Sequence, residues 1–423
     1  MHTDNSTSPL TTLPVALALY AVLAGAHAVI VPVFVPPDEM SHVAHAAHLR
    51  TGALPRVDQS GMGGTVETAI YPPLYPALMA PFTAGLDFAE IRHLRAVGAG
   101  RDWGPLRRQI FLLRLLTVLI GASMVALTYS ITRRTSGDET AFVAALLAGA
   151  LPQLSFIAGA VNPEVLAAAL VAAAFLYLGD GRWYRAAALI GLAGITRPQA
   201  VGAAAAIPVF ALLSRERLRV RPAAVALAMA VAVTPIAAWG LRNLGEYGQM
   251  FLLDTQASTL YDTSERRLDW GPYLDHCVRL FFPSFIGRFG HMDLPLPDGA
   301  VQIALVLWAL GLARGTWLAL RRPELRAALA AALAAAAGVA AAVIVFYLSY
   351  DSPQGRHVFA ALPALSLVAA TGLIHGWPDA VRRRLAVLVP LFFVALSAWA
   401  LVVLEWPAYA LSCLLYTSPS PRD

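Results

Sequence analysis

The segment that decides the fold is residues 327–348, which read AALAAALAAAAGVAAAVIVFYL. It carries no charged side chain over a length that can cross the hydrocarbon core of a bilayer, which is about 30 Å thick. Residues 385–404 have the same character, and short stretches containing arginine separate such segments along the chain. A helix satisfies its own backbone hydrogen bonds in lipid. The sequence therefore predicts an all-α polytopic membrane protein.

The overall composition supports this prediction. Of the 423 residues, 58% are hydrophobic and 13% are charged, against roughly 45 to 50% and about 25% in soluble domains. This excludes a soluble enzyme, a nucleic-acid-binding module and a disulfide scaffold. The net charge of +5 comes from 31 basic residues that are all arginine. We interpret this excess as a topology signal and predict no nucleic-acid partner.

We expect a single transmembrane domain over residues 1–412. The expected spans are residues 12–35, 109–131, 139–159, 163–179, 222–240, 299–318, 327–348, 358–375 and 385–404. One further apolar segment, residues 186–213, is interrupted by Thr196-Arg197-Pro198-Gln199. A charge and a helix-breaking proline would lie at membrane depth there. We expect a broken hairpin that enters and leaves on the same side.

The arginines of the short loops predict the orientation. With one such hairpin, they all fall on one face, which the positive-inside rule makes cytoplasmic. These residues are Arg133, Arg134, Arg182, Arg185, Arg215, Arg217, Arg219, Arg221, Arg321, Arg322, Arg326 and Arg382 to Arg384. Two long extracytoplasmic loops, residues 36–108 and 241–298, and a short turn at 349–357 then face outward. Any chemistry is expected there.

Both ends of the chain need separate interpretation. Residues 413–423 read CLLYTSPSPRD and resemble a translated sequencing adapter, so we expect an artefact, with the natural C-terminus missing. That interpretation leaves Cys277 without an intrachain disulfide partner. Ala26-His27-Ala28 suits a signal-peptide cleavage site, but no lysine or arginine precedes it and the apolar run continues to Val35. An uncleaved anchor is therefore expected.

Two adjacent carboxylates follow the first span in the sequence PPDEMSH, residues 36–42. Carboxylates at the mouth of an apolar helix are costly to desolvate, so Asp38 and Glu39 are candidates for catalysis. They equally suit the start of the next helix, because acids favour the positive end of a helix dipole. Both interpretations stay open at this point.

Histidines and tyrosines in the same loop offer further candidates. His42, His45 and His48 recur every three residues and share a helix face, a spacing that could bind a divalent cation. Because the sequence defines no fourth ligand, we assign no metal site and no certain cofactor. Tyr71 and Tyr75 lie in YPPLYP, residues 71–76. Tyrosines at a membrane interface more often serve as anchors.

Three other motifs contain polar groups. Asn162-Pro163-Glu164 is explained as a helix start, with an N-cap, a first-turn proline and an acid on the dipole. The segment FIGRFGHMDLP, residues 285–295, contains Arg288, His291 and Asp293, which a solvated loop would also explain. SPQGRH, residues 352–357, contains Gln354 and Arg356. An outward-facing arginine departs from the charge rule, so Arg356 should have an anionic partner.

Taken in order over residues 10–405, these motifs resemble those of a known family. They are Pro-Asp-Glu-x-x-His, Pro-Pro-Leu-Tyr, Arg114-Leu115-Leu116, Asn-Pro-Glu, Ser284-Phe285-Ile286-Gly287 with Gly290 and Asp293, and Gln-Gly-Arg. The chain resembles a bacterial family of multi-pass membrane proteins of uncharacterised function that is related to the GT-C glycosyltransferases. Glu164, His291 and His357 depart from the family pattern, which has Asp, an aromatic residue and Tyr there.

The resemblance implies a GT-C-like transmembrane helix bundle and an inverting transfer of sugar from a polyprenyl-phosphate donor to a cell-envelope glycan or lipid. It implies a bacterial inner-membrane location with the active site facing outward. Asp38 would be the base, and Glu39 or His42 would orient it or help to hold a divalent cation. Arg356, with Arg288, would neutralise the departing phosphate. The other residues expected to bind substrate are His42, Tyr71, Tyr75, His291, Asp293 and Gln354.

A transporter or flippase of lipid-linked saccharide is the alternative. Such proteins show internal repeats and ionisable residues near the membrane midplane. Here the midplane candidates are Arg114 and Arg197, and no internal repeat is visible. A structural membrane scaffold is a third option, against which the clustered acids of the outer loop argue.

Overall fold

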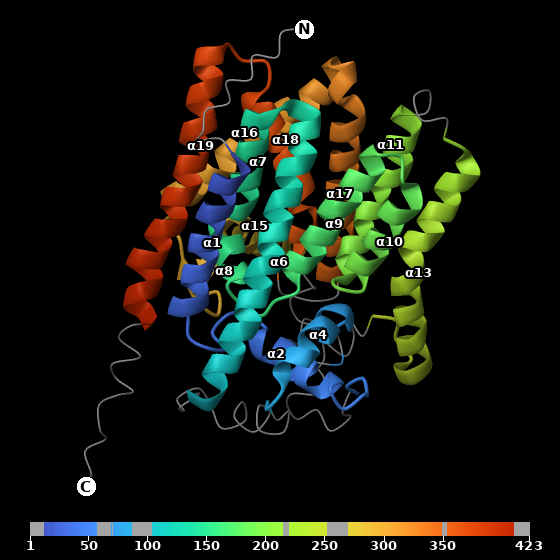
Figure 1. Cartoon of the computed structure of the whole chain (residues 1–423), viewed down its shortest axis with the longest axis vertical. Coiled ribbons are helices and arrows are strands. Elements are labelled where there is room, and N and C mark those ends of the chain that lie inside the picture. The colour runs from blue at the N-terminus through green and yellow to red at the C-terminus, as the bar shows by residue number, and fades with distance from the viewer. Residues whose placement is uncertain are drawn as a thin grey trace.

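The computed structural model is a bundle of helices, most of which run roughly along the long axis of the molecule (Figure 1). It describes residues 12–56, 69, 71–86, 104–214, 220–251, 270–348 and 353–409. The foreign tail expected at 413–423 and parts of the outer loops lie outside these residues.

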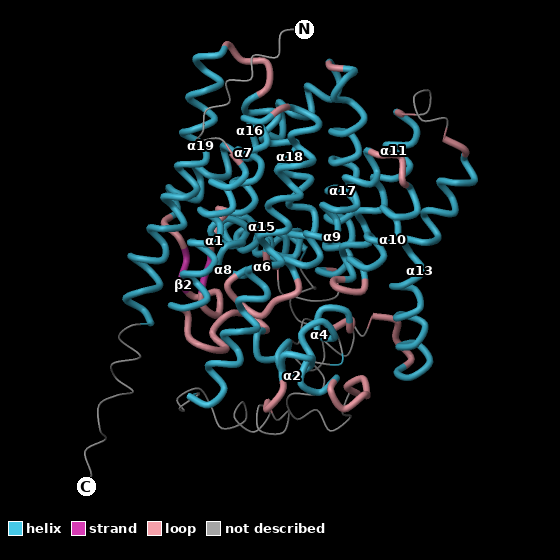
Figure 2. The backbone as a smooth tube through the Cα atoms, in the orientation of Figure 1, coloured by secondary structure: helices cyan, strands magenta, loops and turns pink. Residues whose placement is uncertain are grey.

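Within the described residues, the only strands are β1 (Arg288–Phe289) and β2 (Leu294–Pro295). They pair antiparallel, with Arg288 opposite Pro295, and Figure 2 shows them at the side of the bundle. The predicted all-α membrane fold is confirmed.

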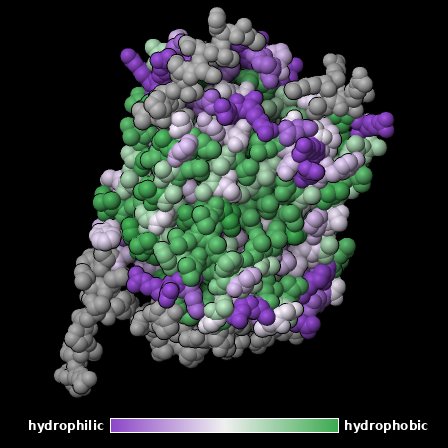
Figure 3. All heavy atoms as spheres, viewed as in Figure 1, coloured by the Kyte–Doolittle hydropathy of each residue, from purple (hydrophilic) through white to green (hydrophobic). Residues whose placement is uncertain are grey.

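Seven described helices are long and apolar enough to cross a membrane. They are α1 (Leu13–Ile30), α6 (Gly104–Ser136), α13 (Pro222–Tyr247), α16 (Asp298–Arg321), α17 (Pro323–Tyr347), η4 with α18 (Gly355–Ala361 and Leu362–Ile374), and α19 with η5 (Asp379–Trp399 and Ala400–Glu405). Hydrophobic residues form a belt between two polar ends in the space-filling view (Figure 3). The belt is the surface expected to contact lipid.

Several apolar helices are broken or short. The stretch 139–159, expected as one continuous span, forms α7 (Asp138–Gly149) and α8 (Pro152–Ala158), which are bent by 64°. Pro152 explains the break, because proline lacks the N–H that would continue the α7 ladder. The next helix, α9 (Glu164–Gly179), has 16 residues. Non-helical backbone at membrane depth is tolerated where protein buries it.

The segment expected as a broken hairpin consists of α10 (Trp183–Gly194), the 3₁₀ helix η2 (Pro198–Ala205) and α11 (Ala206–Leu213). Arg197 has an extended backbone conformation, with φ −141° and ψ 118°, as expected before a proline. Gly202 of η2 lies against Gly338 of α17, so closely that a Cβ on Gly202 would meet the Gly338 backbone at 2.3 Å. This contact fixes η2, and with it the position of Arg197.

The remaining described helices belong to the predicted outer loops. They are α2 (Glu39–Leu49), α4 (Leu74–Met79), η1 (Ala80–Thr83) and α15 (Trp270–Ile286). Figure 1 shows α2 and α4 at one end of the bundle. The ends of α6 and α16 that carry Arg133 and Arg321 lie at the opposite end. The arginine-rich ends and the acidic first loop are therefore on opposite sides.

Candidate active site

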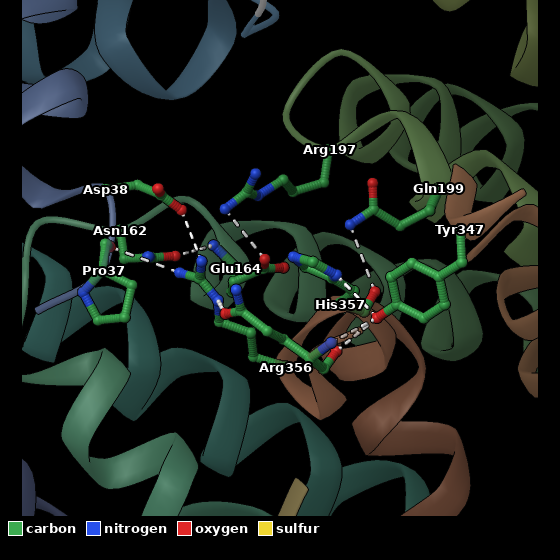
Figure 4. A network of polar contacts seen from close by, with 10 residues as sticks. Pro37, Asp38, Asn162, Glu164, Arg197, Gln199, Tyr347, Arg356 and His357 are labelled. Atoms are coloured by element: carbon green, nitrogen blue, oxygen red, sulfur yellow. Dashed lines mark hydrogen bonds and ion pairs between the residues drawn. The ribbon is translucent and has the colours of Figure 1, made fainter. Parts of the chain in front are cut away.

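Four chain breaks meet in the interior next to α2, and each contributes one charged side chain. Asp38 comes from the α1–α2 connection, Glu164 from the start of α9, Arg197 from the break before η2, and Arg356 from η4. Figure 4 shows all four in one network. Broken helices expose backbone and end in polar groups, so this is where an apolar bundle can hold charges.

The first ion pair of this network joins Asp38 and Arg356. Arg356 Nη2 donates to Asp38 Oδ2 at 2.6 Å, although 318 positions separate the two residues. The arginine is also held by Gln354 Oε1, which accepts from Nε at 2.7 Å, and by the Pro37 carbonyl at 3.4 Å. The Asp38 side chain is 33% exposed, whereas that of Arg356 is 3% exposed. A buried guanidinium held by three hydrogen bonds thus contacts a partly exposed carboxylate.

Strain marks the backbone of Asp38. Its φ of 63° and ψ of 2° lie in the left-handed region, and its side chain makes no capping hydrogen bond to α2. A non-glycine residue in this region costs of order 1 kcal/mol or more and often belongs to a functional site. Burial alone would raise the pKa of the Asp38 carboxyl, but the positive charges of Arg356 and Arg197 lower it below its usual range. The carboxylate is therefore ionised at neutral pH.

Glu39, the neighbouring acid, faces a different partner. Arg114 of α6 donates to both of its oxygens, from Nε at 2.7 Å and from Nη2 at 2.6 Å. The backbone N–H groups of Phe34 and Val161 fill the remaining positions. A carboxylate with four donors and no exposure has no lone pair left for substrate or metal. The catalytic or orienting role expected for Glu39 does not fit this geometry, and the residue instead ties α1 and α6 to the loop before α9.

His42, Tyr71 and Arg197 pack against one another beside Asp38. The rings of His42 and Tyr71 are 4.5 Å apart between centroids, and the Arg197 guanidinium lies 5.4 Å from the Tyr71 ring. Burial and the charge of Arg197 lower the pKa of His42 well below its usual value, so the ring is neutral. Both of its nitrogens lack a hydrogen-bond partner within the described part of the chain. The buried His42 ring therefore has unused hydrogen-bonding capacity.

Tyr75 makes an edge contact with the His42 ring, with 6.3 Å between the ring centroids. It is fully buried, and its hydroxyl bonds with Thr117 Oγ1 at 2.7 Å. The substrate contact expected of Tyr75 is therefore not supported by its position, and its ring serves to anchor α4 on α6.

The β1–β2 hairpin holds the three polar residues expected from the second loop. The Arg288 backbone N–H donates to Gln153 Oε1 at 2.6 Å, and its guanidinium donates to the Met292 carbonyl within the hairpin. His291 and Asp293 are exposed. The structure thus keeps the Arg288 guanidinium in its own turn and not beside Arg356. The paired role expected for these two arginines is not supported.

Ser284, from the motif before this hairpin, does reach the site. Its hydroxyl accepts from the Gly355 N–H at 2.8 Å. A Cβ on Gly355 would meet the Phe285 backbone at 2.4 Å, so only glycine permits this approach. The contact sets the start of η4 and the position of Arg356.

Sequence reasoning missed the second ion pair. Arg197 Nη2 lies 3.0 Å from Glu164 Oε1, and both residues are buried. Glu164 had a sufficient explanation as a helix start, and the Glu164 N–H indeed donates to Asn162 Oδ1 at 3.0 Å. The available signal was the charge of Arg197 at membrane depth, which requires a counter-ion. His357 was also missed as a site residue, and its Nδ1 bonds with the Tyr347 hydroxyl at 2.9 Å.

The metal hypothesis finds no support in the described residues, which contain no group of three or more His, Cys, Asp or Glu side chains placed to hold an ion. His45 is buried, and burial, followed by the charge of His48, lowers its pKa to about 3.

Two kinds of comparison with known proteins bear on this site. A family model described as dolichyl-phosphate-mannose-protein mannosyltransferase matches residues 107–239. The matched part contains Arg114, Glu164 and Arg197 but neither Asp38 nor Arg356. Among curated proteins, none matches the chain in sequence at a significant level.

Solved structures match over almost the whole chain. ArnT from Cupriavidus metallidurans, bound to undecaprenyl phosphate, is 17% identical with a TM-score of 0.49, over 96% of this chain and 74% of ArnT. The archaeal oligosaccharyltransferase AglB from Archaeoglobus fulgidus, in complex with an inhibitory peptide and a dolichol-phosphate, is 14% identical with a TM-score of 0.50. That match covers 97% of this chain and 56% of AglB. At this identity, the match to AglB shows that the two chains share a fold.

Proposed function

We propose that the protein is an integral membrane glycosyltransferase that moves a sugar from a polyprenyl-phosphate donor to an extracytoplasmic cell-envelope acceptor. The observation that carries this proposal is the Asp38–Arg356 pair, in which a partly exposed carboxylate contacts a buried, anchored guanidinium. Glycosyl transfer from a lipid phosphate needs one base for the acceptor and a positive charge for the leaving group. The pair supplies both.

In this reaction the acceptor oxygen attacks the anomeric carbon of the donor sugar. The bond between that carbon and the phosphate oxygen breaks, and the polyprenyl phosphate leaves with the bonding electrons. The acceptor proton passes to an Asp38 oxygen. A single displacement inverts the configuration at the anomeric carbon and requires one base, so no second carboxylate has to act as a nucleophile.

Arg356 would couple the two halves of this step. In the free protein it lowers the pKa of Asp38, which makes the carboxylate a weak base. A donor phosphate that binds Arg356 competes with Asp38 for the guanidinium. Asp38 then loses its main counter-ion, so its pKa rises toward the range in which a base is effective. Donor binding thereby activates the base.

The orientation belongs to the same proposal. The arginine-rich helix ends lie opposite α2 and α4 in Figure 1, and the positive-inside rule assigns such ends to the cytoplasm. Asp38 then faces outward from a bacterial inner membrane. After replacement of Cys277 and Cys413, a cysteine at exposed Thr51 should react with an impermeant thiol reagent in intact cells, and one at exposed Ala380 should not. Reaction at Ala380 alone would invert this assignment.

The transporter alternative rests on ionisable residues at membrane depth. Arg114, its first candidate, donates five hydrogen bonds, two to Glu39 and three to the carbonyls of Ala28, Val31 and Pro32. A guanidinium saturated by the protein has no donor for a passing substrate. Arg197 remains, and it lies in the same network as Asp38. These contacts favour the transferase over the transporter.

The test is a transfer assay with purified protein in lipid nanodiscs. The donors are undecaprenyl-phosphate-linked hexoses labelled in the sugar, and the acceptor is a cell-envelope extract from a bacterium lacking the gene. We expect release of undecaprenyl phosphate together with labelled glycan or lipid. Failure of native mass spectrometry to detect any bound polyprenyl-phosphate lipid, combined with no transfer from any donor, would overturn the proposal.

A further inference from the structure

The Glu164–Arg197 pair is incompletely satisfied. Its ion-pair distance is 3.0 Å, and Glu164 is 0% and Arg197 6% exposed. Yet this contact between Arg197 Nη2 and Glu164 Oε1 lacks hydrogen-bond geometry, and Glu164 Oε2 and Arg197 Nε have no hydrogen-bond partner among the described residues. Buried ionised groups are normally hydrogen-bonded, because an unmet charge inside a protein is strongly destabilising. This pair therefore has capacity for a ligand.

A second buried ion pair in the same chain, Glu39–Arg114, has no free hydrogen-bonding position on its carboxylate and serves for comparison. Glu39 and Arg114 are the same two residue types at comparable burial, and their carboxylate has four donors. Burial and residue type therefore do not explain why Glu164 is left open. The difference is location, because Glu164 lies in the network that contains Asp38 and Arg356 (Figure 4).

The open positions define the chemistry of the ligand. The carboxylate oxygens of Glu164 require donors, whereas the guanidinium of Arg197 requires acceptors. A phosphate offers acceptors only, and its charge would be repelled by Glu164. A hydroxyl offers both a donor and an acceptor and carries no charge. Two neighbouring hydroxyls on one ring could therefore bond to the carboxylate and to the guanidinium together.

An aromatic surface lies next to these positions. The Tyr71 ring packs on the Arg197 guanidinium at 5.4 Å and on His42 at 4.5 Å. The unpartnered nitrogens of His42 add a further donor and acceptor beside Asp38. Charged hydroxyl-binding groups next to an aromatic ring suit a sugar ring and do not suit a lipid tail.

We propose that Glu164 and Arg197 form the subsite for the donor sugar and bind its hydroxyl groups, while Arg356 binds the phosphate. This proposal rests on the proposed function, whose donor it divides between two arginines. The two pairs then bind different parts of the donor. The Asp38–Arg356 pair contacts the bond that breaks, and the Glu164–Arg197 pair determines which sugar is accepted.

The experiment measures lipid binding and needs no acceptor. Native mass spectrometry of the full chain in nanodiscs gives the affinity for undecaprenyl phosphate and for undecaprenyl-phosphate-linked hexoses. The wild type should prefer at least one glycosylated lipid to the bare phosphate. Glu164→Gln should lower the affinity for that lipid about tenfold, the effect of losing a hydrogen bond to a charged group. Its affinity for undecaprenyl phosphate should stay unchanged.

Matched variants separate this subsite from a general loss of structure. Arg356→Gln should weaken both lipids, and Glu324→Gln, an exposed acid at the other end of the bundle, should weaken neither. If Glu164→Gln does not yield folded protein, Glu164→Asp keeps the charge but withdraws it by one methylene. It should also lose affinity selectively for the glycosylated lipid.

The outcomes distinguish the two proposals. Equal weakening of both lipids by the Glu164 variants, or no weakening of either, would overturn the sugar subsite and leave the proposed transfer intact. The same holds for a wild type that binds the bare lipid as well as every glycosylated one. A wild type that binds neither lipid would overturn the proposed function itself.

Discussion

Asp38 and Glu39 are adjacent in the sequence, but the structure gives them opposite surroundings. Glu39 is fully buried and accepts four hydrogen bonds from Arg114, Phe34 and Val161. Asp38 is 33% exposed and bonds to Arg356 through one oxygen. The difference shows that two adjacent acidic residues can have different roles. The Glu39 carboxylate stabilises the fold around the site, and the Asp38 carboxylate keeps one oxygen without a hydrogen bond to Arg356.

The backbone explains how neighbours can differ so much. The left-handed conformation of Asp38 turns the chain between the prolines and α2. As a result, the Asp38 side chain points to η4 while Glu39 points to α6. Strain at this position is stabilised by the Glu39–Arg114 lock on one side and Arg356 on the other. The following predictions test this division of roles.

The largest effect is expected from the structural pair. Arg114→Ala leaves the Glu39 carboxylate buried without its cation, which costs about 3 to 5 kcal/mol of stability. The variant should express poorly and melt at a much lower temperature in detergent. Arg133→Ala removes a surface ion pair with Asp138 and should change the melting temperature little, since such pairs contribute about 0 to 1 kcal/mol. A stable Arg114→Ala protein that has lost only transfer would reverse the roles assigned to the two pairs.

Asp38→Asn should have the next largest effect, on rate and not on stability. The amide keeps the size of the carboxylate and most of its hydrogen bonding but cannot accept the acceptor proton. Transfer should fall by roughly 10² or more, while folding and lipid binding persist. Asp275→Asn, which changes an exposed acid of α15, is the control. Full transfer by the Asp38 variant with a confirmed donor would remove Asp38 from the mechanism.

Arg356→Lys should have a smaller effect. Lysine keeps the charge but loses the planar fork that contacts Asp38, Gln354 and Pro37. We expect KM for the donor to rise about tenfold, with expression retained, because arginine and lysine are not equivalent at such sites. Steady-state kinetics at varied donor concentration provide the measurement. An unchanged KM would place the phosphate elsewhere.

The smallest effect concerns pH. Because Arg356 lowers the pKa of Asp38, the basic form persists on acidification, and kcat/KM should stay level from pH 7 to about pH 5. Stability from this pair is likewise present above the ordinary pKa of Asp and is lost only as pH falls through the lowered value. In Arg356→Gln the pKa of Asp38 rises, so the residual kcat/KM should decline over the same range. A wild-type kcat/KM that already declines with a pKa near 6 would point to a different base.

Much of the fold could be predicted from the sequence. Residues 327–347 lie within α17 and residues 385–404 within α19 with η5, because a long apolar segment in lipid has no alternative to a helix. The break around Arg197 was also visible, since Pro198 cannot continue a helix. The bend at Pro152 was missed although proline stood there, because the apolar composition continues on both sides of it.

The site was predicted in part. The sequence singled out Asp38 and Arg356 as unusual charges, and the structure places them in contact. It equally singled out Glu39, Arg288 and Tyr75, whose partners turn out to be Arg114, Met292 and Thr117. Residue type predicts that a buried charge needs a partner. It does not say which of several candidates provides it.

The sequence by itself therefore determined that the protein is an all-α polytopic membrane protein, where most of its apolar segments lie, and the loops in which polar groups concentrate. These properties depend on the local balance between lipid and water, which composition reports. Only the tertiary structure decided that Asp38 meets Arg356 across 318 positions while Glu39 meets Arg114, and that Glu164 is left open beside Arg197. The pairing of charges depends on where four separate breaks in the helices converge, and no local property of the chain encodes that convergence.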